Sequence, residues 1–167
     1  ETQPTAYGDG GETAGTIAGV TVGTVTNDQI SGIELGPDSA ALDNDFDEVR
    51  SSIGGRVYDD VDASGSPTAV EPGINGVSIA LTGTNDLGNP VSMTTTTGGD
   101  GDFSFTGLLS GTYTLTETQP VGFVDGDDTV GSAGGDGVTQ NDQVSAIALG
   151  AGVTESGYFF GEVVPVS

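Results

Sequence analysis

The stretch from Asp60 to Glu71 has the residue types and the spacing of a calcium-binding loop. Counted from Asp60, carboxylates occupy positions one, three and twelve, hydroxyls occupy positions five and nine, and glycine occupies position six. Ca²⁺ binds six to eight oxygens, and glycine at position six permits the sharp turn that wraps twelve residues around one ion. The predicted ligands are Asp60, Asp62, Ser64, the backbone carbonyl of Ser66, Thr68 and Glu71.

The residues on either side of this loop indicate β structure and not the two helices of a calcium sensor. Alternation of apolar and polar residues predicts strands at 53–58 and 77–81, and Pro72 disfavours a helix leaving the loop at Glu71. With three charged ligands, we expect a dissociation constant on the order of 10⁻⁴ to 10⁻⁵ M. A solvated acidic turn is the alternative interpretation.

A second acidic segment follows later in the chain. Asp125, Asp127 and Asp128 are close in sequence, and Asp136 lies a few residues beyond them. These four carboxylates are a candidate second calcium site, with a solvated glycine-rich loop as the alternative. Asn141-Asp142 either contribute to the same ion or only turn the chain.

The charge balance excludes several classes of partner. The chain of 167 residues has 25 acidic residues, two basic residues and a formal net charge of -23. Nucleic acids and anionic membranes are bound through lysine and arginine, so neither is expected, and no apolar run is long enough to cross a bilayer. Self-repulsion on this scale favours bound cations as part of the fold, with a solvated acidic surface as the alternative. Without histidine, cysteine or lysine, catalysis is not expected either.

An internal repeat organises the chain. The matching segments keep the same order, and they are residues 1–16 with 117–132, 25–36 with 138–150, and 46–49 with 160–163. The repeat unit is about 115 residues long, the size of an immunoglobulin-like sandwich. We therefore expect residues 51–167 to form one complete repeat and residues 1–50 to be the C-terminal half of a preceding repeat.

Within the complete repeat, alternation and turn residues predict about seven short strands. The expected strands are residues 53–58, 77–81, 91–97, 102–106, 112–117, 145–149 and 158–164. The glycine-rich turn at 98–101 predicts a hairpin between the third and fourth of these strands. The many glycines and the lack of helical periodicity favour an all-β fold, an immunoglobulin-like antiparallel β-sandwich with calcium-binding loops.

Residues 1–50 lack most of the strands with which they would share a core. Either they pack against the following repeat, or a neighbouring subunit completes them by strand addition, which makes the chain a building block of a fibre. The expected partners are therefore neighbouring repeats or like subunits. A ligand- or carbohydrate-binding module is the alternative function, although the chain has no tryptophan to offer as an aromatic platform.

Two segments carry a resemblance to a known family. They are VYDDVDASGSPTAVEPGINGVSIALTG, residues 57–83, and TTTTGGDGDFSFTGLLSGTYTLTETQPVGF, residues 94–123. Both are similar to the B-type repeat domains of serine-aspartate-repeat surface adhesins, which are related to collagen-adhesin B domains. The resemblance implies a calcium-rigidified, immunoglobulin-like stalk module in tandem on secreted or cell-surface proteins. It also implies calcium ligation by Asp60, Asp62, Ser64 and Glu71.

The same resemblance draws attention to Glu117. Many collagen-adhesin B domains and pilins are locked by an isopeptide bond between lysine and asparagine, with a carboxylate as the catalyst. Glu117 stands where that carboxylate is expected, but the sequence contains no lysine, so this crosslink cannot form within it. We expect Glu117 to be an ordinary strand residue and bound metal to act as the staple.

Overall fold

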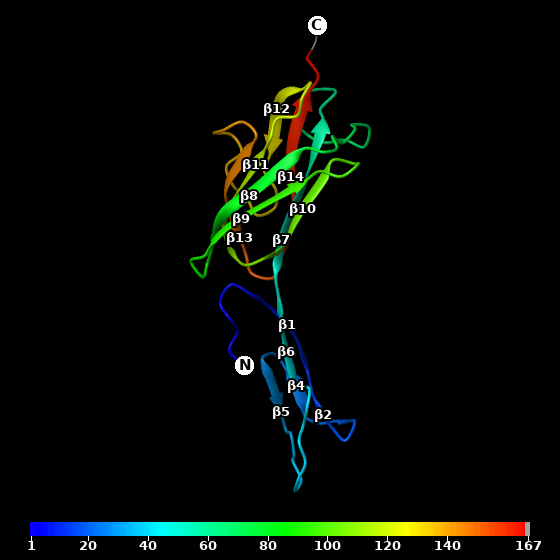
Figure 1. Ribbon diagram of the computed structural model, residues 1–167, viewed down its shortest axis with the longest axis vertical. Helices are drawn as coiled ribbons and strands as arrows, with labels where there is room; N and C mark the ends of the chain where they lie inside the picture. The colour runs from blue at the N-terminus through cyan, green and yellow to red at the C-terminus, as the bar shows by residue number, and fades with distance from the viewer. Residues whose placement is uncertain (166–167) are drawn as a thin grey trace.

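Two four-stranded sheets form a sandwich in the later part of the chain (Figure 1). The first sheet has the order β10 (Asp102–Leu108), β7 (Ser51–Asp59), β14 (Thr154–Val163) and β12 (Val124–Thr129). The second has the order β13 (Gln143–Leu149), β11 (Gly111–Glu117), β8 (Ser78–Asn85) and β9 (Pro90–Thr96). The computed structural model describes residues 1–165, so the last two residues of the expected repeat 51–167 lie outside the described residues. Within that range, no helix is long and apolar enough to cross a membrane.

The core of the sandwich comes from the inward positions of the alternating strands. Phe103 and Phe105 of β10 and Leu115 of β11 are at most 5% exposed, as alternation predicts. The Phe103 ring lies 6.1 Å from the ring of Phe160, which β14 contributes from the same sheet. The Tyr113 hydroxyl donates a hydrogen bond to the Leu109 carbonyl at 2.8 Å, so this buried phenol keeps a partner. The fold is the expected all-β immunoglobulin-like sandwich.

The structure corrects two details of the expected topology. Residues 124–129, interpreted from sequence as an acidic loop, form the edge strand β12, which pairs with β14. Aspartate and glycine disfavour strands, so only the pairing with β14 makes this segment extended. In addition, β7 and β14 pair in parallel, whereas the other pairs of both sheets are antiparallel.

The hairpin expected between residues 91–97 and 102–106 does not form. β9 pairs with β8 in one sheet, whereas β10 pairs with β7 in the other. The Gly101 amide donates to the Gly98 carbonyl at 2.9 Å, so the predicted turn exists, but it carries the chain between the sheets. A β-carbon at Gly101 would lie 2.1 Å from the Val57 carbonyl oxygen, which explains why this position needs glycine.

Residues 1–50 form a narrow extension of two-stranded sheets at one end of the sandwich (Figure 1). These sheets are β1 (Gly8–Thr13) with β6 (Asp45–Val49), β2 (Thr16–Ile17) with β3 (Val20–Thr21), and β4 (Thr24–Thr26) with β5 (Gln29–Ser31). The β1–β6 pair has the register of the β12–β14 pair, with the bulge at the equivalent place. The sequence repeat is therefore also a structural repeat.

The extension and the sandwich meet in a close-packed joint. The Arg50 guanidinium stacks over the Tyr7 ring at 5.2 Å and donates to the Gly107 carbonyl at 3.1 Å. A β-carbon at Gly8 would lie 2.3 Å from the α-carbon of Gly152, so the two backbones touch. One of the two basic residues of the chain thus serves the joint.

Phe160 and Phe46 occupy equivalent positions in the two structural repeats and make a matched pair for mutation. Phe160 is fully buried, whereas Phe46 is 36% exposed. We expect Phe160→Ala to lower the free energy of unfolding by about 3–5 kcal/mol, the usual cost of emptying a buried aromatic site. Phe46→Ala should cost less than about 1 kcal/mol, because few atoms leave a packed environment. Chemical denaturation measures both, and equal losses would contradict the difference in packing.

Candidate metal centre

The Asp60–Glu71 loop leaves β7 and returns to the same place in the fold. The Asp60 amide donates to the Glu162 carbonyl at 2.7 Å, and the Asp59 amide donates to the Pro72 carbonyl at 2.9 Å. These two bonds pin the start of the loop to β14 and bring its end back beside its start. Carboxylate oxygens of Asp60, Asp62 and Glu71 consequently lie within 4.8 Å of one another.

Local hydrogen bonds hold the Asp60 carboxylate in place at the centre of the loop. Asp60 is 2% exposed, and it accepts bonds from the Ser64 amide at 3.0 Å and the Gly65 amide at 2.9 Å. Burial raises the pKa of Asp60, but the Gly65 and Ser64 amides outweigh it and leave this pKa below its ordinary value. Gly65 has a φ of 68°, the left-handed conformation that the predicted turn requires.

The neutral ligands predicted for this loop make local contacts. The Ser64 hydroxyl donates to the Ser66 carbonyl at 3.3 Å, which places both oxygens together. The Thr68 amide and hydroxyl donate to Glu71 Oε2 at 2.7 and 3.1 Å. The other oxygen, Glu71 Oε1, is buried and has no hydrogen-bond donor within residues 1–165. An orphaned buried carboxylate oxygen in an all-oxygen loop fits a hard cation such as Ca²⁺.

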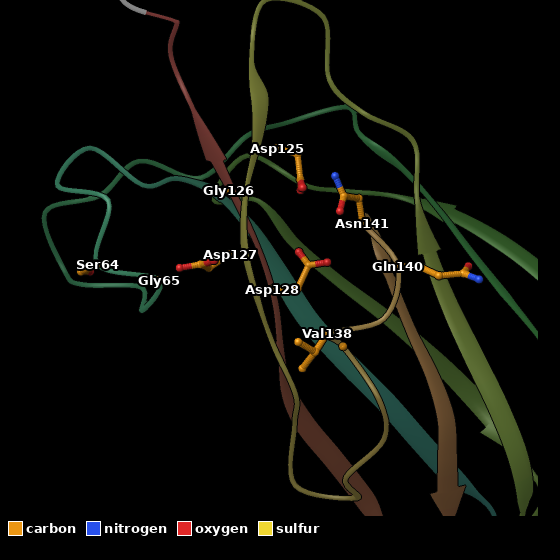
Figure 2. Close-up of a pocket in the computed structure, with 10 residues that line it drawn as sticks. Ser64, Gly65, Asp125, Gly126, Asp127, Asp128, Val138, Gln140 and Asn141 are labelled. Atoms are coloured by element: carbon orange, nitrogen blue, oxygen red, sulfur yellow. The ribbon is translucent and has the colours of Figure 1, made fainter.

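The structure divides the four carboxylates of the predicted second site. Asp127 is exposed and lies beside the first loop, where a β-carbon on Gly65 would be 3.0 Å from Asp127 Oδ2. Figure 2 shows Asp127 directed toward Gly65, whereas Asp125 and Asp128 point to the side where Asn141 lies. These residues line an open cavity of about 410 Å³. Asp127 therefore does not point to the same side as Asp125 and Asp128, with which the sequence analysis grouped it.

Asp136 is engaged by hydrogen bonds within its own turn. Its carboxylate accepts hydrogen bonds from the Val138 amide at 3.1 Å, the Thr139 amide at 3.2 Å and the Thr139 hydroxyl. These bonds keep the pKa of Asp136 low. Asp136 therefore stabilises a turn that precedes β13.

Glu117 and Glu162, which the sequence did not assign to a site, converge with Asp142 near Asp125 and Asp128. Oxygens of Glu117, Asp142 and Glu162 lie within 4.8 Å of one another, although β11, the turn before β13, and β14 supply them separately. Glu117 is 4% exposed and Glu162 is fully buried. We call the set Glu117, Asp125, Asp128, Asp142 and Glu162 the inter-sheet carboxylate cluster.

Burial and mutual repulsion raise the pKa values throughout the inter-sheet carboxylate cluster. Burial, followed by the charge of Glu162, raises the pKa of Glu117 to about 9. Burial also raises the pKa of Glu162 to about 8, although a hydrogen bond from Gln119 opposes the rise. Burial and neighbouring carboxylates raise the pKa of Asp128 to about 7 and that of Asp125 to about 6. Without a bound cation, the fold therefore favours protonated carboxyls here.

Tyr58 lies between the loop and the inter-sheet carboxylate cluster. Burial, followed by the charges of Asp60, Glu71 and the β12 aspartates, raises the pKa of Tyr58 to about 12. Its hydroxyl is buried without a hydrogen-bond partner in the described chain. Tyr58 therefore stays neutral and separates the two groups of carboxylates.

Residues 1–50 contain the counterpart of the inter-sheet carboxylate cluster. Asp9, Glu12 and Asp28 have carboxylate oxygens within 4.8 Å of one another. Gln3 donates to Glu48 Oε2 at 2.5 Å, just as Gln119 donates to Glu162 Oε2. The signal that could have revealed Glu117, Asp142 and Glu162 was present in the sequence, because Glu1, Asp28 and Glu48 occupy the matching repeat positions.

The raised pKa values predict how stability depends on pH in the absence of divalent cations. A carboxyl that binds its proton more tightly in the folded state stabilises the fold below the ordinary pKa, 4.5 for glutamate. That stabilisation is lost as the pH rises through the folded-state values of about 8 for Glu162 and about 9 for Glu117. In EDTA, melting temperatures measured by circular dichroism should therefore fall as the pH is raised from the ordinary glutamate pKa of 4.5 to about 9.

Glu117→Gln is the control for this pH dependence, because it keeps the shape of the side chain and removes its titration. The decline in melting temperature with pH should be shallower in this variant. A melting temperature that rises over the same pH range in EDTA would contradict the assigned pKa directions.

Comparisons with known proteins agree with this architecture. The SdrD B-like domain family matches residues 51–161, which is more than half of the chain. Serine-aspartate repeat-containing protein D of Staphylococcus aureus (strain Newman) is 33% identical over 112 residues, 66% of this chain and 8% of that protein. Bone sialoprotein-binding protein of Staphylococcus aureus (strain MRSA252) is 36% identical over 89 residues, 53% of this chain and 8% of that protein.

Two solved structures align with the chain. The minor pilin GBS52 of Streptococcus agalactiae has a TM-score of 0.43 and 12% identity, covering 78% of this chain and 54% of that chain. The group B streptococcus pilus 2b backbone protein has a TM-score of 0.33 and 18% identity, covering 85% of this chain and 55% of that chain.

The match to the family rests on the complete repeat and leaves most of each relative uncovered. This chain spans less than a tenth of the length of these two curated relatives, since it covers 8% of each. The chain belongs to the SdrD B-like domain family.

Proposed function

We propose that the chain is a calcium-stabilised structural repeat of a secreted or cell-surface adhesin, stalk or extracellular fibre. The observation that carries the proposal is the convergence of Asp60, Asp62 and Glu71 carboxylate oxygens within 4.8 Å of one another. All the donors of this loop are oxygens, which favours Ca²⁺ over zinc. Glu71 Oε1 is buried and accepts no hydrogen bond from the described chain, so a bound ion would give this oxygen a partner.

The loop is well placed to stiffen the sandwich. It joins β7 of one sheet to β8 of the other, and Arg56 donates to the Glu71 carbonyl at 2.8 Å from within β7. An ion that fixes Asp60 to Glu71 therefore restrains the connection between the two sheets. The sequence contains neither cysteine nor lysine, so neither a disulfide nor a lysine isopeptide bond can supply this restraint.

We also propose that residues 1–50 are the C-terminal half of a repeat and that residues 51–167 are a complete one. Leu35 and Phe46 are 60% and 36% exposed, while their counterparts Leu149 and Phe160 are at most 3% exposed. In the complete repeat, residues 51–116 form the N-terminal half that covers these apolar side chains. We propose that the equivalent segment of a second copy of this chain, or of a tandem neighbour, covers Leu35 and Phe46.

The tyrosines favour a structural role over a carbohydrate-binding module. Tyr58, Tyr113 and Tyr158 are at most 1% exposed, and Tyr7 is engaged by Arg50 in the joint. Sugar-binding modules present aromatic faces to solvent, and these four side chains face the interior or the joint.

Calcium should raise the melting temperature through the Asp60 loop. If the dissociation constant is on the order of 10⁻⁴ M, about 10 mM calcium stabilises the fold by about 2.7 kcal/mol, which corresponds to a rise of about 5–10 °C. Asp60→Asn with Asp62→Asn should remove most of this rise, as measured by calorimetric melting with calcium or EDTA. Asp100→Asn with Asp102→Asn, which removes two exposed carboxylates, is the charge-matched control. Equal melting temperatures with calcium and EDTA in the wild type would refute the proposal.

Completion of residues 1–50 by a second copy predicts concentration-dependent association. Sedimentation velocity in calcium should show oligomers that grow with protein concentration, and Phe46→Asp should weaken them at least tenfold by placing a charge on the uncovered face. Glu34→Gln provides a control that leaves the apolar positions intact. A strict monomer at all concentrations would exclude completion by a second copy.

A further inference from the structure

The inter-sheet carboxylate cluster presents a set of oxygens that protein groups leave without partners. Both carboxylate oxygens of Glu117 are buried and have no hydrogen-bond donor within residues 1–165. The same holds for one oxygen each of Asp125, Asp128, Asp142 and Glu162. Buried polar atoms are almost always paired, so this concentration of unpaired acceptors calls for a positively charged partner.

No side chain of the described part of the protein supplies that charge. The two basic residues are committed elsewhere: Arg50 donates to Gly107 and Tyr7, and Arg56 donates to Asp100 and Glu71. The donors that reach the cluster are neutral: Gln119 donates to Glu162 Oε2, and the Gln143 and Asp142 amides donate to Asp128. Glu117, Asp142 and Glu162, whose oxygens lie within 4.8 Å of one another, therefore face no cationic side chain of residues 1–165.

We propose that the inter-sheet carboxylate cluster binds a hard divalent cation, with Ca²⁺ as the best fit, and that this ion clamps the two sheets together. Glu117 and Asp142 come from the β11 and β13 side, whereas Asp125, Asp128 and Glu162 come from β12 and β14 of the other sheet. Oxygens of Glu117, Asp142 and Glu162 lie within 4.8 Å of one another, as ligands of one ion do. Asp125 and Asp128 neighbour Asp142 and each add an unpartnered oxygen. The site goes beyond the loop of the proposed function, since it shares no ligand with it.

The repeat supports this assignment independently. The Glu117 amide donates to the Asp142 carbonyl at 2.8 Å, and the Glu1 nitrogen donates to the Asp28 carbonyl at 2.6 Å. Asp142 and Asp28 both have a left-handed backbone, with φ of 56° and 55°. The same backbone geometry thus holds equivalent carboxylates in two segments whose surroundings differ, although the first copy is more exposed.

Calcium titration by calorimetry tests the site in a background from which the other acidic sites are removed. The full chain with Asp60→Asn and Glu71→Gln in the loop, and Asp28→Asn in the first repeat copy, is expected to retain calcium binding. Adding Glu117→Gln should weaken the remaining binding at least tenfold, whereas adding Asp102→Asn should leave it unchanged. Magnesium is the second titrant, and the flexible carboxylate set should bind it more weakly than calcium.

The outcomes separate this inference from the proposed function. A background variant that binds no calcium overturns the inter-sheet site and leaves the Asp60 loop as the calcium site. If the loop substitutions change nothing while Glu117→Gln abolishes binding, the inter-sheet site stands and the loop assignment fails.

Melting experiments distinguish a cation from a network of protonated carboxyls. Glutamine has the shape of a neutral glutamic acid, so a protonated network predicts that Glu117→Gln changes neither the melting temperature nor calcium binding. A cation site predicts that Glu117→Gln reduces the rise in melting temperature on adding calcium, because the variant lacks a charged ligand.

Carboxyl ¹³C NMR on the wild-type chain provides the test if the variants fail to fold. The Glu117 and Glu162 resonances should shift during a calcium titration, in addition to that of Glu71. Unchanged Glu117 and Glu162 resonances at saturating calcium would overturn the inference.

Discussion

Repulsion among buried carboxylates is the constraint on which the rest of this structure depends. Glu117 and Glu162 are almost fully buried near each other, and burial raises the pKa values of both well above the ordinary value. A chain with 25 acidic and two basic residues cannot neutralise such a group with its own side chains. Protons or a bound cation must do so, and the stability of this end of the sandwich therefore depends on pH when no cation is bound.

The two acidic groups share structural elements and are therefore mechanically connected. β14 carries Glu162, and the carbonyl of the same residue accepts the Asp60 amide at 2.7 Å at the start of the loop. Tyr58 lies between the groups, and the Thr129 hydroxyl of β12 donates to the Gly65 carbonyl of the loop at 3.0 Å. A change in one group is thus transmitted by short, direct contacts to the backbone that positions the other.

Sequence spacing was sufficient for the loop but not for the inter-sheet carboxylate cluster. Asp60, Asp62 and Glu71 lie within one turn-rich segment, so their separation along the chain limits their separation in space. Glu117 and Glu162 belong to strands of different sheets, and no local rule connects them. Proximity in sequence was in fact misleading for Asp127 and Asp136, because Asp127 faces the loop and Asp136 stabilises a turn.

The sequence by itself determined the all-β class, the alternating core positions such as Phe103 and Leu115, the repeat, and the geometry of the Asp60 loop. These features follow from period-two alternation, turn residues and short-range spacing, which act between neighbours along the chain. Only the tertiary structure decided that β12 is a strand, that β9 and β10 lie in different sheets, and that Glu117, Asp142 and Glu162 meet. Those outcomes depend on pairing and register between distant strands, which are fixed by the packing of the whole sandwich.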